Sequence, residues 1–216
     1  TLVILANGPS LKNVLPNLTT DTSFVNVDFL VLNYFAKDSV FFQIKPKHYC
    51  FADPMFFGNS LRLKEVKELF DILNLKVDWN MNIYIPTNKY NDFMNFSNID
   101  NININIIKMN TVPYLGFEKF RNYFYKIGSS MPIIGTVANF AIFIGLNLGY
   151  SKLNLYGVDH TFFDSLTVNK ENKVCNRQSH FYDNKEVVLK PIIKVVDGKG
   201  FKISEYIDSI NLMFKS

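Results

Sequence analysis

The sequence predicts an α/β domain with a mainly parallel sheet flanked by helices, and three observations lead to this fold class. Short, continuously apolar runs recur along the chain, as buried parallel strands require. Segments with helical spacing separate several of these runs. Each run ends at a turn or a polar residue, which is typical of the alternating units that build a parallel sheet. With 216 residues, of which 48% are hydrophobic, the chain can bury one substantial core.

The elements follow in order along the chain. The first strand, residues 2–5, leads through a turn into a short helix expected at residues 11–15. Further strands are expected at residues 27–32, 48–52, 82–86, 104–107 and 152–156. Asn alternates with Ile and Asp over residues 98–105, which predicts a half-exposed edge strand. Longer helices are expected at residues 60–73, with Ser60 as N-cap, and at residues 117–127, 136–148 and 204–214.

This order predicts one main domain with smaller additions. Residues 1–160 form a Rossmann-like α/β domain on this interpretation. Residues 161–200 lose periodicity and gain charge, which is typical of a lid or active-site loop. Residues 201–216 then supply a C-terminal helix that packs on the main domain. No strand is evident after that helix, so the possibility that the sequence is a fragment of a longer protein stays open.

Composition and charge exclude several classes of protein. The net charge is +4, from 23 Lys and Arg against 19 Asp and Glu, and the basic residues are scattered. Nucleic-acid binders usually cluster these residues and use more Arg, so we expect no nucleic-acid partner. The charge leaves open a weak attraction to an anionic substrate or membrane surface. The most apolar stretch, residues 133–148, is interrupted by Gly, Thr and Asn and is too short to span a bilayer.

Further expectations concern location and assembly. The first residues lack the basic start of a signal peptide, so we expect a cytoplasmic protein, with peripheral attachment to the inner face of the plasma membrane as an option. Cys50 and Cys175 are too few and too far apart for a metal knuckle or a disulfide framework, which indicates two reduced thiols. The aromatic-rich residues 117–125 are a candidate interface for a homo-oligomer.

Polar residues follow four of the expected strands. In parallel α/β sheets, ligands bind outside the carboxyl ends of the strands. We therefore expect these residues to meet at one ligand site: Asn7 and Gly8, Asn33, Asp53, and Asp159 with His160.

The turn after the first strand is a candidate phosphate site. Gly8, Pro9 and Ser10 lie between a strand and an expected helix, where free backbone N–H groups and a helix N-terminus would bind an anion. The alternative is structural: Ser10 acts only as an N-cap and Gly8 only as a turn residue. The sequence has neither GxGxxG nor GxxxxGK[ST], which disfavours classical dinucleotide binding and P-loop chemistry.

Metal and nucleophile motifs are also missing. Asp159 and His160, completed by Asp164 or His180, could supply metal ligands, but no diagnostic spacing such as HExxH occurs, and a substrate-orienting Asp-His pair is favoured. No GxSxG motif anchors serine hydrolase chemistry. His180 lies in a charged, aperiodic segment, where it is either a general base or a surface histidine. For His48, at the start of a strand, a structural role is expected.

Several segments resemble the bacterial sialyltransferases of glycosyltransferase family 42. The most specific are NGPSL at residues 7–11 and GYSKLNLYGVDH at residues 149–160, with LNYF at residues 32–35 and FADP at residues 51–54. The latter part, with SHFY at residues 179–182, is even more similar to a related polysaccharide-locus family that is labelled 6-hydroxymethylpterin diphosphokinase-like. Together the matches span residues 2–182.

The resemblance implies a GT-A-like nucleotide-binding domain and an inverting, metal-independent transferase. Its donor would be a CMP-activated acidic sugar, with no further cofactor, and its acceptor an oligosaccharide or lipid-linked glycan of the bacterial surface. His180 lies in the segment that holds the family's general base, with Asp159 and His160 as further catalytic candidates. The nucleotide-binding residues would be Asn7, Gly8, Pro9, Ser10, Asn33, Asp53, Gly135, Thr136, Gly157 and Val158.

Two other functions stay open at this point. The first is a diphosphokinase-like enzyme that transfers pyrophosphate from ATP to a hydroxymethyl group. That reaction requires Mg2+ and carboxylates such as Asp53, Asp159 and Asp164. The second is a binding protein without catalytic activity. The family's arginine before the long helix is absent from residues 131–136, so the donor sugar also stays open.

Overall fold

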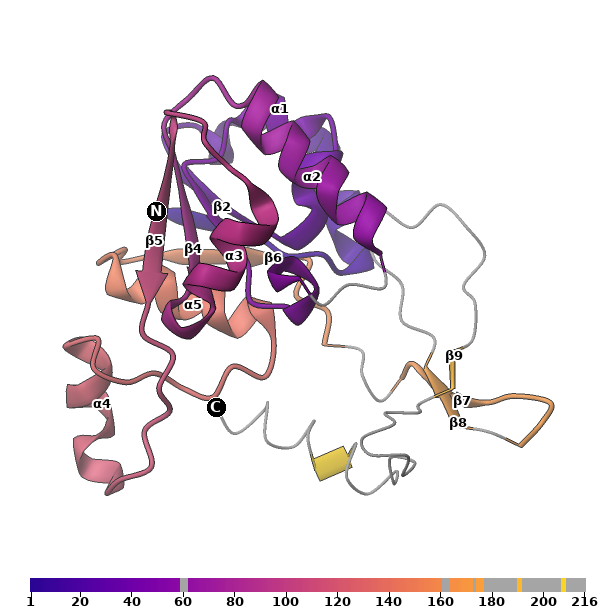
Figure 1. Cartoon of the computed structure of the whole chain (residues 1–216), viewed down its shortest axis with the longest axis vertical. Coiled ribbons are helices and arrows are strands. Elements are labelled where there is room, and N and C mark those ends of the chain that lie inside the picture. The colour runs from indigo at the N-terminus through magenta and orange to yellow at the C-terminus, as the bar shows by residue number, and fades with distance from the viewer. Residues whose placement is uncertain (59–61, 161–163, 173, 177–189, 192–206, 209–216) are drawn as a thin grey trace.

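The computed structural model describes residues 1–58, 62–160, 164–172, 174–176, 190–191 and 207–208 (Figure 1). Its centre is a six-stranded sheet in the order β5-β4-β3-β2-β1-β6, and all five pairings are parallel. The predicted α/β class and the six predicted strands are confirmed. The strands are β1 (Leu2–Leu5), β2 (Asp28–Leu32), β3 (His48–Cys50), β4 (Met81–Pro86), β5 (Ile104–Met109) and β6 (Leu153–Tyr156).

The strand order places a topological switch next to β1. From β1 the chain builds the sheet outward to β5, and it then returns to add β6 on the other side of β1. At such a switch point, a crevice outside the carboxyl ends of the strands is the usual place for a ligand.

Helices cover both faces of the sheet. They are α1 (Val40–Ile44), α2 (Leu63–Lys76), α3 (Tyr90–Ser97) and α5 (Val137–Asn147), whereas α4 (Glu118–Lys126) stands apart from these layers. Val3 and Leu5 of β1 belong to the core that includes α2 and α3, whereas Leu2 and Ile4 belong to the core that includes α5. Side chains alternate between the faces of a strand, so an uninterrupted apolar run is what a strand between two helical layers requires. Figure 1 shows α5 on the side of the sheet opposite α2.

The short helix predicted after β1 differs from the structure. Residues 9–13 and 15–17 form two 3₁₀ helices instead of the α-helix expected at 11–15. Pro16 lacks an N–H group and disfavours the helical conformation at Leu15, so an α-helix cannot propagate through this segment. The loop after β1 consequently ends in a tight 3₁₀ turn.

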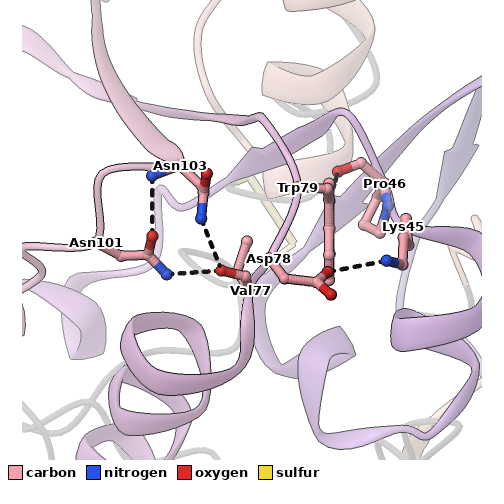
Figure 2. A network of polar contacts seen from close by, with 7 residues as sticks. All are labelled: Lys45, Pro46, Val77, Asp78, Trp79, Asn101 and Asn103. Carbon is pink, nitrogen blue, oxygen red and sulfur yellow. Dashed lines mark hydrogen bonds and ion pairs between the residues drawn. The ribbon is translucent and has the colours of Figure 1, made fainter.

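The edge-strand prediction for residues 98–105 is only partly correct. β5 is an edge strand and is half-exposed, but it begins at Ile104. The side-chain nitrogen Nδ2 of Asn101 donates to the backbone carbonyls of Leu73, Asn74 and Val77, where α2 ends. Asn103 donates to Val77 as well (Figure 2). These asparagines satisfy helix carbonyls that lack partners within the helix, and this preference overrides the alternating pattern.

Other differences concern the ends of the chain and the helices. α2 begins at Leu63 after Arg62, and the predicted N-cap Ser60 lies outside the described residues. Of the helix expected at residues 204–214, only residues 207 and 208 are described.

The region expected as a lid includes a three-stranded antiparallel sheet of β7 (Leu166–Val168), β8 (Val174–Asn176) and β9 (Lys190–Pro191). Among the described helices, none has the length and apolarity to cross a bilayer.

A hydrogen-bonded chain joins four segments at the amino ends of the strands. Tyr150 donates to the carboxylate of Asp28, which also accepts from Lys47 at 3.1 Å. The oxygen of Tyr150 then accepts from Nε2 of His48 at 3.0 Å, and Nδ1 of His48 accepts from the hydroxyl of Tyr84 at 3.0 Å. His48 is buried and neutral, because burial, together with the nearby Lys47, lowers its pKa to about 4. The structural role expected for His48 is thus observed.

We predict that this histidine makes folding stability sensitive to acid. Its pKa rises from about 4 in the fold to the ordinary 6.5 on unfolding, so protons bind preferentially to the unfolded chain in this interval. Stability is therefore fully present above about pH 6.5 and falls as the pH decreases toward 4. Urea unfolding across this range should show a shallower decrease for His48→Gln than for the natural chain.

Asp28, in the same network, makes a separate contribution to the pH dependence of folding stability. Burial alone would raise its pKa, but hydrogen bonds from Tyr150 and Lys47 outweigh this effect and lower the pKa below 3.8. Its stabilisation is lost only in stronger acid, below the interval in which His48 titrates. An unchanged slope between pH 6.5 and pH 4 in His48→Gln would contradict the assignment to His48.

Candidate functional site

A pocket of about 540 Å³ lies at the switch between β1 and β6, where the carboxyl ends of four strands meet. Its walls come from the loops after β1, β2, β3 and β6 and from the start of α5. The structure brings together eleven of the residues predicted from the sequence: Asn7, Gly8, Pro9, Asn33, Asp53, Gly135, Thr136, Gly157, Val158, Asp159 and His160. Ser10 lies beside the pocket without lining it, and His180 lies outside the described residues.

The loops after β1 and β6 are held in direct contact. The N–H of Gly8 donates to the carbonyl of Gly157 at 2.8 Å, and the N–H of Ser10 donates to Oδ2 of Asp159 at 3.0 Å. Both amides expected to be free for phosphate thus have partners within the protein. The expected helix N-terminus is also missing, because a 3₁₀ helix with Gly8 as N-cap follows β1. The backbone N–H groups that were expected to be free at Gly8 and Ser10 are therefore paired, and the N-cap is Gly8 and not Ser10.

The close contact explains both glycines. A Cβ on Gly8 would lie 2.1 Å from Oδ2 of Asp159 and 2.5 Å from the carbonyl oxygen of Gly157. Gly157 has φ of +70°, and a Cβ there would lie 2.7 Å from the carbonyl oxygen of Ala6. Only glycine permits these approaches, and at position 157 also the left-handed backbone. Both glycines thus permit the contact between the two loops.

Two asparagines leave polar atoms unsatisfied at the pocket. The side chain of Asn7 is only 9% exposed, and its Oδ1 has no hydrogen-bond partner among the described residues. Oδ1 of Asn33 is buried and has none either. A buried acceptor without a donor costs free energy, so a ligand with N–H or O–H groups would gain from meeting these two atoms.

Asn33 is positioned by a residue that the sequence analysis missed. Asn33 adopts φ of +47°, a left-handed conformation that Asn tolerates better than most residues. The buried hydroxyl of Tyr49 donates to the Asn33 carbonyl and accepts from the N–H of Ala36 at 3.2 Å. Tyr49 sits within an apolar strand, and no local sequence pattern distinguishes it from a core aromatic residue.

The N-terminus of α5 opens into the pocket. Gly135, Thr136, Val137 and Ala138 all line it, and Oγ1 of Thr136 caps the helix by accepting from the N–H of Asn139 at 3.2 Å. No acidic residue occupies the first turn. The positive end of this helix dipole therefore faces the cavity and favours an anion there. Gly135 and Thr136 were among the predicted site residues, but the helix N-terminus was expected after β1 and not here.

The carboxylates of the pocket are engaged with the backbone. Oδ1 of Asp53 accepts from the N–H of Met55 at 3.1 Å and caps a 3₁₀ helix, and Asp159 holds Ser10. Within the described part of the chain, no group of three or more His, Cys, Asp or Glu side chains is arranged to hold a metal ion. Asp164 is not on the pocket wall, so the carboxylate set considered for Mg2+ does not come together there.

His160 is the basic residue on the described wall, and neither Lys nor Arg lines it. Its φ of +46° places it in the left-handed region immediately after the Asp159 contact. The remaining lining residues are apolar: Ala6, Leu32, Ala52, Pro54, Met55, Ile134, Val137 and Ala138. In the sequence, nothing distinguishes such apolar residues from those of the core. The pocket therefore combines an apolar lining with a few converging polar groups, as ligand sites commonly do.

We predict that crowding at the loop contact makes Gly157 irreplaceable. Gly149 offers a matched control, because its φ of +80° is equally left-handed but a Cβ there would meet nothing within 4 Å. Gly149→Ala should lower the free energy of unfolding by about 1–2 kcal/mol, the cost of left-handed backbone alone. Gly157→Ala should cost more in urea unfolding, because the Ala6 backbone must also move. Equal losses in both variants would contradict the contact.

No protein-family model matches this chain, and no curated protein sequence matches it significantly. Its function must therefore be inferred from the site itself. That site provides a pocket at the switch point of a parallel sheet, two unsatisfied amide oxygens, and a helix N-terminus that faces the cavity.

Proposed function

We propose that this protein is a glycosyltransferase that transfers an acidic sugar from a CMP-activated donor to a surface-glycan acceptor. The observation that carries the proposal is the pairing, in one pocket, of unsatisfied acceptors on Asn7 and Asn33 with the N-terminus of α5. Such a pocket offers hydrogen-bond acceptors to a nucleoside and a positive dipole end to an anion. CMP as the nucleotide follows from the sequence resemblance.

The nucleoside half of the donor fits the asparagine side of the pocket. Cytosine has an exocyclic amine and ribose has two hydroxyls, and all of these donate hydrogen bonds. Oδ1 of Asn7 and Oδ1 of Asn33 supply acceptors for them. The volume of about 540 Å³ lies within the range of roughly 300–1,000 Å³ that is usual for small-molecule sites.

The phosphate belongs at the start of α5 in this proposal. The Ser10 N–H already donates to the carboxylate of Asp159, and the negative charge of this carboxylate repels a second anion there. The first turn of α5, next to Gly135 and Thr136, has no acidic residue. CMP-sugars carry a single phosphate, so this helix end and neighbouring hydroxyls can stabilise the leaving group without a divalent cation.

The chemical step needs a base on the acceptor side. The base removes the proton of the acceptor hydroxyl, the acceptor oxygen bonds to the anomeric carbon, and the bond from that carbon to the phosphate oxygen breaks to release CMP with inversion. His180 is the proposed base, and His160 is the histidine on the described pocket wall. Asp159 fixes the loop that carries His160 through its bond to Ser10.

We predict that the protein binds CMP without a metal. Calorimetry with CMP, CDP, UDP and ATP, each with Mg2+ and with EDTA, should give binding to CMP that EDTA leaves unchanged. Asn7→Ala should weaken CMP binding about three- to tenfold, the usual effect of one lost hydrogen bond. Asn13→Ala, which changes an exposed asparagine on the nearby 3₁₀ helix, is the matched control and should bind normally. ATP binding that requires Mg2+ would instead support the diphosphokinase.

We predict different kinetic losses for the two histidines. His180→Ala should lower the transfer rate about 100- to 10,000-fold and leave the donor Kd nearly unchanged, as the loss of a general base does. His160→Ala should weaken donor binding, because this residue lines the pocket. Initial rates and donor titrations on both variants separate these effects. Equal losses of rate and binding in His180→Ala would remove it from the role of base.

A further inference from the structure

An exposed apolar surface surrounds α4. Six large hydrophobic side chains within sixteen consecutive residues are between 44% and 86% exposed, and together we name them the α4 surface: Val112, Leu115, Phe117, Phe120, Tyr123 and Ile127. None of the residues of α4 itself is fully buried. Isolated exposed hydrophobics are normal on proteins, but six of them in one short segment are the pattern of an interaction site.

The α4 helix has one attached side and one open side. Tyr125 packs its ring against Phe143 of α5 at 5.9 Å, and Phe124 stacks on Tyr114 at 5.2 Å. Phe120 and Tyr123 lie three residues apart on the open side, with Ile127 four residues further. In Figure 1, α4 stands apart from the layers that cover the sheet. Its open side is thus apolar while its attached side already has partners.

The charge next to the open side is positive. Lys119 and Lys126 are seven residues apart and so lie on the same side of the helix, beside Tyr123. Arg121 is paired with Glu118 at 3.3 Å, whereas no acidic side chain of the described residues pairs with Lys119 or Lys126. The combination of exposed aromatics with flanking lysines is typical of helices that lie in a membrane interface.

We propose that the α4 surface binds an anionic lipid bilayer, with its aromatic side chains inserted between headgroups and its two lysines on lipid phosphates. A second copy of this chain is the less favourable occupant, since a symmetric contact through this helix would bring the lysines of both copies together. Charge complementarity thus selects the lipid surface. This binding does not depend on the nucleotide proposed for the pocket.

α4 lies at the same edge of the sheet as the pocket, so a membrane bound at α4 would lie close to the pocket. α4 follows β5 at the carboxyl edge of the sheet, where the pocket also lies. Only residues 128–133 separate Ile127 from Ile134 on the pocket wall, which is at most about 25 Å of chain. A bilayer on the α4 surface would place the pocket near acceptors that are attached to lipid.

Vesicle co-sedimentation of the full chain tests the proposal. The protein should bind vesicles of phosphatidylcholine with phosphatidylglycerol more tightly than phosphatidylcholine alone, and added salt should weaken the binding. The double variant Lys119→Gln/Lys126→Gln should lose about 30-fold in affinity, since each basic residue near an anionic surface contributes about fivefold. Phe117→Ser/Phe120→Ser should also lose binding, because it removes inserted apolar area.

The matched control is Lys64→Gln/Lys67→Gln, which removes the same charge from exposed positions on α2 and should bind anionic vesicles normally. Circular dichroism verifies that each variant is folded, which is expected because all the altered side chains are exposed.

Equal binding to neutral and anionic vesicles, or equal losses in both lysine variants, would overturn the proposal. Sedimentation equilibrium that shows a dimer abolished by Phe117→Ser/Phe120→Ser would overturn it as well and identify a second copy as the occupant. CMP calorimetry on the same variants reports separately on the pocket.

Discussion

The contact between the loops after β1 and β6 is the constraint on which the pocket depends. Parallel strands leave the sheet in the same direction, and at a switch point their loops normally diverge. Here Gly8 and Gly157 let the two backbones meet at hydrogen-bonding distance, and Asp159 adds a bond to Ser10. The two loops thus close one side of the crevice, and the remaining opening faces Asn33, Asp53 and the start of α5.

The distribution of satisfied and unsatisfied polar groups defines the chemistry of the pocket. The carboxylates of Asp53 and Asp159 accept backbone N–H groups, so they shape the walls. The amide oxygens of Asn7 and Asn33 have no such partners and are the acceptors that remain for a ligand. The buried Tyr49 fixes the backbone that carries Asn33. The pocket therefore offers buried hydrogen-bond acceptors on one side and the N-terminus of α5 on another.

The two ends of the sheet serve different purposes. At the amino ends, Asp28, Tyr150, His48 and Tyr84 are joined by hydrogen bonds to one another. At the carboxyl ends, unsatisfied acceptors, a helix N-terminus and the α4 surface lie along one edge. The two ends of the strands thus differ in how far their polar groups are paired, and in open parallel sheets ligand sites lie at the carboxyl end.

Local pattern by itself determined the α/β class, the six strands of the main sheet and the polar pocket residues that directly follow strands, because apolar runs report burial on both faces and polar residues at strand ends converge in a parallel sheet. Gly135, Thr136, Gly157 and Val158 were indicated only by the family resemblance. Only tertiary structure decided how these residues are used. The amides of Gly8 and Ser10 are paired across a sequence separation of about 150 residues, Asn101 caps a distant helix, and Tyr49 supports Asn33. Hydrogen-bond partners that are remote in sequence leave no periodic signal, so only the folded chain shows that the helix N-terminus at the pocket belongs to α5 and not to the loop after β1.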